Sequence, residues 1–318
     1  MKRVPELEHL SSADKLIEFL QNRNAEYACL YQKLSTDDND PTLISERYLS
    51  SSSSPDLLPF VLEDDEKVDA DEFTDFNRKA INCSEEQNLM IAVAWSLPEE
   101  KHNFKFCTEV IYVDCTADTN NEERPLLTIS AKNAHGKMFM ILRAFLPNER
   151  AWIFRWIFST VLPNIFGELY LSKVNLVISD GDSCEYTQLD IAIEKYMPNT
   201  LRIRCGWHLV DRGWNNYGPK LKYYQDHKDL YREISCNIKS YLYSWMKPNC
   251  ETYDEYLISR SLLFKYLSSP QVMNTLGKEY YNSVCNWIRL HIDPHLEKIL
   301  FCYRKKFICD LVMPGLPI

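Results

Sequence analysis

Two short apolar runs in this chain each end in an aspartate, and this pattern constrains the fold more than any other feature. Residues 110–113 (VIYV) run into Asp114, and residues 174–179 (VNLVIS) run into Asp180. Each run has the length and composition of a buried strand. Two carboxylates held at the ends of neighbouring strands can bind a hard divalent cation such as Mg²⁺. The pattern therefore predicts an α/β sheet with a site for phosphoryl transfer on a nucleic acid.

The order of the predicted elements specifies the fold further. Strands are predicted at 88–95, 109–114, 125–130, 137–145, 174–179 and 200–205, and helices at 148–162 (ended by Pro163) and 184–196. Three strands in a meander, a helix, a strand, a helix and a strand form the layout of the ribonuclease H-like fold. That fold is a mixed sheet with helices on both faces.

Composition divides the chain into four parts. Apolar residues at helical spacing over 11–35 predict an N-terminal helical segment, residues 1–35. A serine run and an acidic cluster indicate a partly disordered linker over residues 36–86. The ribonuclease H-like domain is expected over 87–270, with a helical insertion from about 209–250. Residues 271–318 are predicted to be a further, incomplete helical segment.

The charge is distributed unevenly between the two ends of the chain. The formal net charge is −9, but residues 1–100 hold 9 Lys and Arg against 22 Asp and Glu, whereas residues 201–318 hold 17 against 11. The acidity is thus N-terminal, and the mildly basic C-terminal part leaves contact with DNA open, although it lacks the dense basic patch of a dedicated DNA-binding module. Membrane spans and a signal peptide are not expected, because no apolar run is long enough. Eleven scattered cysteines fit a reducing, intracellular compartment.

A third acid would complete a two-metal site, and residues alone leave its identity open. Glu251, Asp254 and Glu255 open a helix that runs to about residue 267. Thr252 and Glu255 also have the spacing of a capping box, which gives Glu255 a purely structural alternative. Asp182, two residues after Asp180, is expected either to cap the next helix or to join the metal site, and capping is favoured.

A cysteine and a histidine lie three residues apart after the last predicted strand. Cys205 and His208 could bind one face of a Zn²⁺, but a structural zinc needs four ligands. The further candidates His227, Cys236 and Cys250 show no tight metal spacing. Packing and hydrogen bonding beside the acidic site is therefore the preferred interpretation of this pair.

Residues from about 88 to 270 resemble the transposase domain of Mutator-like elements (MULE), which is related to the plant FAR-RED-impaired-type transcription factors. The resemblance rests on signatures in a fixed order: Asp114-Cys115-Thr116-Ala117-Asp118-Thr119-Asn120, Pro125-Leu126, Gly136-Lys137, Glu149 with Trp152, Phe154 and Trp156, Ile178-Ser179-Asp180-Gly181-Asp182, Ala192-Ile193 with Pro198, and Cys205-Gly206-Trp207-His208-Leu209.

This resemblance implies a DDE-type transposase that cuts and joins DNA with Mg²⁺ or Mn²⁺. It assigns the first two acids to Asp114 and Asp180, and Glu255-Tyr256 fits the family's final glutamate best. The implied partners are transposon terminal inverted repeats and target DNA, in the nucleus, with a homo-oligomer left open. The family's terminal zinc motifs are not evident, since residues 1–85 hold only Cys29 and Cys83. A fragment, a truncated element or a domesticated remnant is therefore expected.

Two other functions compete with the transposase hypothesis. A domesticated regulator would keep the fold and its contacts without cleavage. A 3′–5′ exonuclease on the same fold would need an Asp-x-Glu pair on the first strand, but residue 116 is threonine. The exonuclease is therefore ranked last.

Overall fold

The structure is a computed structural model, and its chain separates into two compact units. The first unit comprises Met1–Val177 and Asp182–Thr200, and the second comprises Ile178–Gly181 and Leu201–Ile318. The structure describes residues 12–33, 44–49, 58–60, 88–116, 124–133, 135–180, 183–219, 228–248 and 250–303.

In the described part of the chain, nine strands form one sheet in the order β3-β2-β1-β4-β7-β6-β5-β8-β9. The strands are β1 (Glu26–Lys33), β2 (Ile44–Leu49), β3 (Leu58–Phe60), β4 (Asn88–Ser96), β5 (Val110–Thr116), β6 (Leu126–Lys132), β7 (Met138–Phe145), β8 (Leu176–Ser179) and β9 (Leu201–Arg204). The pairs from β3 through to β5 are antiparallel, so β5, β6 and β7 form the predicted meander. All six strands predicted from the sequence are present, with ends shifted by one or two residues.

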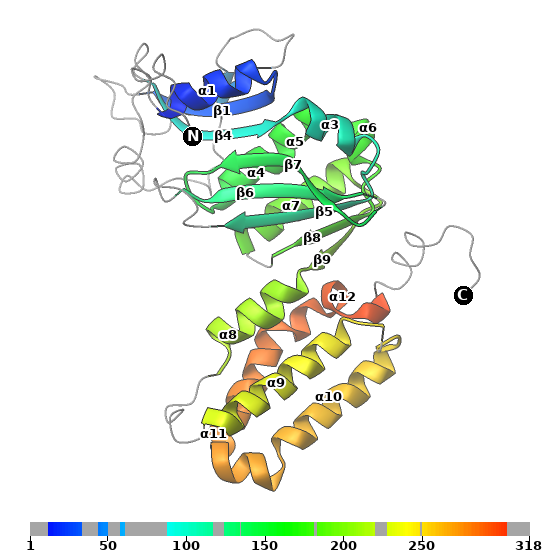
Figure 1. The fold of residues 1–318 in the computed structure, drawn as a ribbon. Helices are drawn as coiled ribbons and strands as arrows, with labels where there is room; N and C mark the ends of the chain where they lie inside the picture. The colour runs from blue at the N-terminus through cyan, green and yellow to red at the C-terminus, as the bar shows by residue number, and fades with distance from the viewer. Residues whose placement is uncertain are drawn as a thin grey trace, which may run out of the picture. The chain divides into compact units, whose positions relative to one another are not determined.

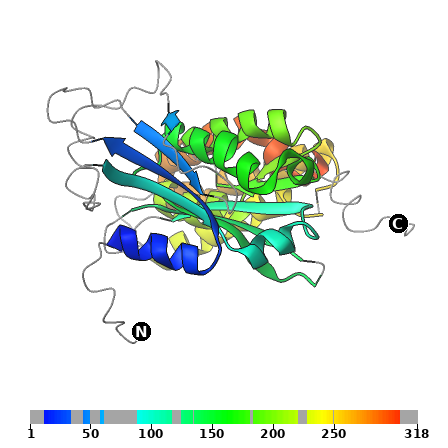
Figure 2. The same ribbon diagram turned by 90° about the horizontal axis from the view of Figure 1, so that it is seen from above.

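Helices cover both faces of the sheet in the first unit, which confirms the predicted α/β class. They are α1 (Ser12–Asn22), α3 (Pro98–Phe104), α4 (Ala151–Arg155), η3 (Trp156–Val161), α5 (Leu162–Phe166), α6 (Glu168–Leu171) and α7 (Ser183–Tyr196). Figure 2 shows α1, in dark blue, on one side of the strands and the green helices of residues 151–196 on the other. Leu20 of α1 packs with Tyr27, Cys29 and Trp95 in its own small core.

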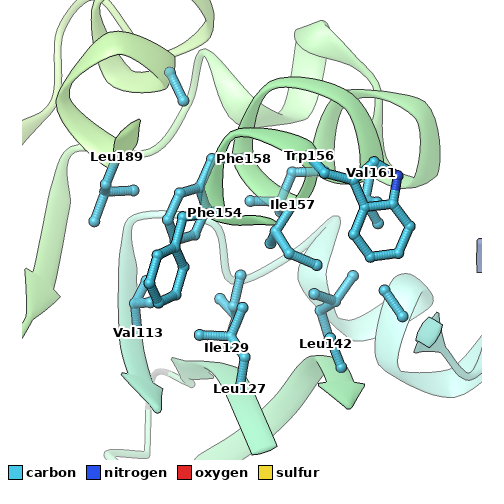
Figure 3. Close-up of a cluster of buried hydrophobic side chains, with 14 of the residues drawn as sticks. Val113, Leu127, Ile129, Leu142, Phe154, Trp156, Ile157, Phe158, Val161 and Leu189 are labelled. Atoms are coloured by element: carbon cyan, nitrogen blue, oxygen red, sulfur yellow. The ribbon is translucent and has the colours of Figure 1, made fainter. Parts of the chain in front are cut away.

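The main core of the first unit lies between the meander and the helices from α4 to α7 (Figure 3). Val113 of β5, Ile129 of β6 and Leu142 of β7 are almost fully buried there. Their strands alternate inward and outward positions, so polar residues fall on the opposite face of the sheet. Phe154 and Phe158 stack on this layer from the helical side, with ring centroids 6.0 Å apart.

The helix predicted to end at Pro163 continues through it to Phe166, which corrects that boundary. Proline has no N–H for the carbonyl four residues earlier, and this loss normally breaks a helix. Here the Tyr196 hydroxyl, from α7, donates to the carbonyl of Ser159 at 3.0 Å. The helix ends instead at Gly167, whose positive φ of 78° is readily adopted by glycine and rarely by other residues.

The N-terminal segment differs from the prediction. Residues 12–22 are helical, but residues 26–33 form strand β1 rather than a continuing helix. Tyr27 and Cys29 face one core while Ala28 and Leu30 face the other, so the chain is extended and buried on both sides. Parts of the predicted linker are also ordered, since β2 and β3 pair with each other and β2 pairs with β1. The serine run and the acidic cluster lie outside the described residues.

The second unit is helical after β9, as expected for the insertion and the C-terminal region. Its elements are η4 (Trp207–Gly213), α8 (Trp214–Tyr217), α9 (Lys228–Trp245), α10 (Tyr253–Leu267), α11 (Pro270–His291), η5 (Asp293–His295) and α12 (Leu296–Ile299), labelled in part in Figure 1. One hydrophobic core runs from Leu209 to Leu300. The predicted boundary at residue 270 therefore divides helices that share a core, and α10 and α11 belong together. No helix in the described part of the chain is long and apolar enough to cross a membrane.

Candidate functional site

Asp114 lies near the end of β5 on the face opposite the main core. Its neighbours Val113 and Cys115 point into or against that core, so the alternation of the strand leaves Asp114 half-buried. The Thr116 hydroxyl donates to Asp114 Oδ2 at 3.2 Å. Thr128, its partner across β6, donates to the Asp114 carbonyl oxygen at 3.3 Å. The carboxylate is thus oriented by a neighbouring hydroxyl and still open to solvent.

Asp180 directly follows β8, and its backbone is fixed by buried neighbours. The Ser179 hydroxyl donates to the Asp180 carbonyl oxygen at 2.9 Å, and the Cys205 N–H donates to the Ser179 carbonyl at 2.8 Å. The Asp180 side chain is 35% exposed, and its Oδ2 lies 4.0 Å from Nε2 of His208. This carboxylate can therefore reach solvent while a histidine approaches it from one side.

The strand order places β5 beside β8, the adjacency that the sequence predicted for the strands of the two acids. Asp182 and the segment Ala117-Asp118-Thr119-Asn120 of the first signature lie outside the described residues. The prediction that Asp182 caps α7 or joins a metal site therefore remains a prediction.

Glu255 sits in the first turn of α10 and completes a capping box. The Thr252 hydroxyl accepts from the Glu255 N–H at 3.2 Å, and Glu255 Oε2 accepts from the N–H groups of Thr252 at 3.1 Å and Glu251 at 2.7 Å. Glu251, Asp254 and Glu255 are all exposed. The structure thus contains the capping alternative raised by the sequence, and the assignment of Glu255 as the third acid remains a prediction.

Cys205 and His208 interact with each other at the start of η4. Burial raises the pKa of the Cys205 thiol, but hydrogen bonds from the His208 side chain and from the backbone of His208 and Trp207 outweigh it, and the pKa lies below its usual range. Between them, Gly206 is closely packed, because a Cβ there would lie 3.1 Å from Sδ of Met246. The cysteine, the histidine and Asp180 therefore form a short polar chain.

Within the ranges that the structure describes, no three His, Cys, Asp or Glu side chains are grouped so that they could hold an ion. Cys236 is exposed, and burial raises the pKa of the Cys250 thiol to about 11, while His227 lies outside the described residues. Zinc at Cys205 and His208, and Mg²⁺ at the three acids, remain predictions.

A second polar cluster one turn further along η4 was not found from the sequence. Asp211 accepts hydrogen bonds from the Tyr243 hydroxyl and, at 3.2 Å, from Nζ of Lys239. The hydrogen bond from Tyr243 is the main cause that lowers the pKa of Asp211, with Lys239 adding to it against partial burial. Burial, and then Asp211, raise the pKa of Tyr243 to about 12. These hydrogen bonds connect η4 to α9. The sequence does not indicate this cluster, because the partners are about thirty residues apart on separate helices.

The part of the chain that contains both strand-end acids can be compared with known families. Residues 110–212 match the MULE transposase domain. The matched stretch begins with β5 and ends in η4, so it includes Asp114, Asp180 and the Cys205–His208 pair. A comparison with curated proteins found no match. This match supports a transposase-related function for the stretch, in which Asp114 lies in β5 and Asp180 directly follows β8.

Proposed function

We propose that the chain is the catalytic part of a DDE-type transposase that cleaves DNA strands and transfers transposon ends with Mg²⁺ or Mn²⁺. One observation carries the proposal: the MULE match contains two aspartates at the ends of strands that are neighbours in the sheet. Asp114 and Asp180 are assigned as metal ligands on this basis. Glu255 is the third acid of the proposal.

The donor chemistry of the proposed ligands suits the ion, since carboxylate oxygens are what Mg²⁺ and Mn²⁺ prefer. When bound, the metal would supply activation of the attacking hydroxyl and neutralisation of the leaving oxygen. Thr116 would keep the Asp114 carboxylate in one orientation through its hydrogen bond. His208, whose Nε2 lies 4.0 Å from Asp180 Oδ2, would limit the movement of that carboxylate from one side.

The proposal includes the partners and location that such chemistry requires. Transposon terminal inverted repeats and target DNA are the proposed substrates, and the nucleus is the proposed location. The basic balance of residues 201–318 supports contact with the phosphate backbone. Zinc at Cys205 and His208 stays a secondary proposal, supported by the lowered pKa of the thiol, since zinc binds thiolate.

A domesticated, non-catalytic regulator is the second candidate, and one observation favours it. The Glu255 carboxylate accepts hydrogen bonds from two backbone N–H groups, those of Glu251 and Thr252, at the start of α10. Capping the helix is therefore a sufficient structural reason for this glutamate. Loss of selection for cleavage would leave that role intact. The experiment must therefore separate the charge of Glu255 from its capping function.

Nicking of supercoiled plasmid with Mg²⁺ or Mn²⁺ tests the proposal. We expect wild-type activity to be lost in Asp114→Asn and Asp180→Asn, which keep the size of the side chain but remove its charge. Glu255→Gln is the decisive variant, because glutamine still completes a capping box but is a poor metal ligand. Thr252→Ala is its matched control, since it removes the other half of the same box and leaves the carboxylate in place.

The outcomes distinguish the candidates. Loss of nicking in Glu255→Gln with activity retained in Thr252→Ala would establish Glu255 as the third acid. An active Glu255→Gln would exclude it and direct the same substitutions to Glu251 and Asp254. A wild type that neither nicks DNA nor binds Mn²⁺ in calorimetry, while remaining folded by circular dichroism, would refute the catalytic proposal in favour of the regulator.

A further inference from the structure

Trp207 is exposed, although the chain otherwise buries its tryptophans. All seven tryptophans lie within the described ranges, and Trp207, the first residue of η4, is 56% exposed. The other six are at most 8% exposed: Trp95, Trp152, Trp156, Trp214, Trp245 and Trp287. A single exposed apolar residue needs no explanation by itself. Trp207 differs from such a residue because it lies beside a proposed metal ligand.

The backbone and one side chain fix Trp207 close to Asp180 within the second unit. The Cys205 N–H donates to the Ser179 carbonyl at 2.8 Å, so the chain that enters η4 is paired with the residue before Asp180. His208 contacts both groups: its ring centroid lies 4.8 Å from that of Trp207, and its Nε2 lies 4.0 Å from Asp180 Oδ2. One side chain therefore separates the exposed indole from the carboxylate.

Contacts on either side of Trp207 limit the movement of its indole. Gly206 lies against α9, where a Cβ would be 3.1 Å from Sδ of Met246 and 3.7 Å from Cε1 of Tyr243. The rings of Trp207 and His208 meet edge to face, at 79°, which is a favourable geometry for aromatic pairs. An aromatic surface that is held in advance loses little freedom when a ligand stacks on it.

Cations lie near this exposed ring. Nζ of Lys247 is 5.5 Å from the centroid of Tyr243, the tyrosine against which the start of η4 packs, and Lys247 is exposed. Arg212 of η4 is exposed as well. Lys239 offsets the charge of the one acid in η4, Asp211, through a hydrogen bond of 3.2 Å. Cations for phosphates beside an aromatic face for bases are the two parts of a site for single-stranded nucleic acid.

We propose that Trp207 is a stacking platform for an unpaired DNA base close to Asp180. Bases within a duplex already stack on one another, so only an unpaired or displaced base offers a free face to the indole. The site therefore selects DNA that is single-stranded beside the point of cleavage. This inference rests on the proposed function for the identity of the ligand as DNA, but it does not depend on cleavage.

Binding measured without a metal tests the inference separately from cleavage. Fluorescence anisotropy in EDTA gives the affinity of the full chain for three labelled DNA hairpins: one blunt, one with a short single-stranded thymidine end, and one with an abasic end of the same length. The abasic end keeps the phosphates and removes the bases. We expect Trp207→Ala to weaken binding of the thymidine end by about tenfold and to leave the other two affinities unchanged.

Two variants serve as matched controls. Trp207→Phe keeps an aromatic face and should retain most of the preference for the thymidine end. Phe106→Ala removes another exposed aromatic ring, which also meets a histidine edge to face, with centroids of Phe106 and His102 5.1 Å apart, but belongs to the first unit. It should leave all three affinities unchanged. Circular dichroism checks that every variant is folded.

The intrinsic fluorescence gives a second readout of the same contact. The six other tryptophans are buried, so quenching by the thymidine end should be present in the wild type and absent in Trp207→Ala.

The outcomes separate this inference from the proposed function. Equal affinity of the wild type for the thymidine and abasic ends would overturn the inference, as would a Trp207→Ala variant that keeps the full preference. A wild type that binds none of the three hairpins would overturn it too. A preference for the thymidine end that depends on Trp207, in a protein that does not nick plasmid, would support the inference and refute only the proposed cleavage.

Discussion

Replacing Tyr196 by phenylalanine should destabilise the first unit through a single carbonyl group. The Tyr196 hydroxyl donates to the carbonyl of Ser159, which Pro163 cannot serve because proline has no N–H. One net hydrogen bond contributes about 1 kcal/mol, and the cost reaches about 3 kcal/mol where a buried carbonyl keeps no other donor. Tyr196 is 8% exposed and borders the main core, so phenylalanine keeps the packing of the ring.

A double-mutant cycle with Pro163→Ala turns this reasoning into a strict test. Alanine at position 163 supplies an N–H that can donate to the Ser159 carbonyl. Tyr196→Phe should therefore lower the free energy of unfolding clearly less in the Pro163→Ala protein than in the wild type. Urea unfolding followed by tryptophan fluorescence reports the change, because Trp152 and Trp156 are buried in the same core. Additive effects within about 0.3 kcal/mol would refute the shared-carbonyl explanation, as would a Tyr196→Phe variant as stable as wild type.

Two further predictions concern the polar groups around η4. The native pKa of Tyr243, about 12, lies above the ordinary value of 10.0, so its contribution to stability is complete below pH 10 and is lost as the pH rises through about 12. The stability advantage of wild type over Tyr243→Phe in urea unfolding should therefore shrink across that window, and a constant difference would contradict the assignment. His208→Ala should raise the pKa of the Cys205 thiol and slow its alkylation by iodoacetamide near neutral pH, measured by mass spectrometry at that cysteine. An unchanged or faster rate in the variant would show that His208 does not lower that pKa.

The strands that carry the two aspartates were predictable because their signal is local. Each is a short apolar run followed directly by an acid, and both runs are strands at nearly the predicted bounds. The hairpin of β6 and β7 was predictable for the same reason, since Gly136 at φ 75° supplies the turn between them. Where a turn residue or a run of β-branched side chains decides the structure, neighbours along the chain are enough.

Strand β1 was predicted wrongly because its pattern is ambiguous on physical grounds. Tyr27, Leu30 and Tyr31 recur at helical spacing, and the preceding helix α1 makes a continuing helix plausible. A strand covered on both faces loses the apolar–polar alternation by which strands are recognised. Only the partners β2 and β4, which lie far along the chain, make this segment extended.

The third acid illustrates a different limit on prediction. A glutamate three residues after a threonine at the start of a helix satisfies the capping pattern, and Glu255-Tyr256 also fits the final glutamate that the family resemblance implies. The capping hydrogen bonds of Glu255 could be anticipated from the sequence and are present. A catalytic role for Glu255 depends on a bound metal and DNA. The capping pattern and its hydrogen bonds would be the same with or without them.

The pairing of β1 with β4 determines where this chain can safely be shortened. The segment that matches the transposase family begins at residue 110, so a fragment cut to that match would discard both strands and α1. A fragment that started at β4 would lack β1, so the backbone of Ala92–Trp95 would lose its hydrogen-bond partners on that edge of the strand. It would also lack α1, which packs against Trp95. An open apolar edge of this kind recruits strands from other molecules. Residues 12–33 thus cover this edge of the sheet, although no signature of the transposase family lies within them.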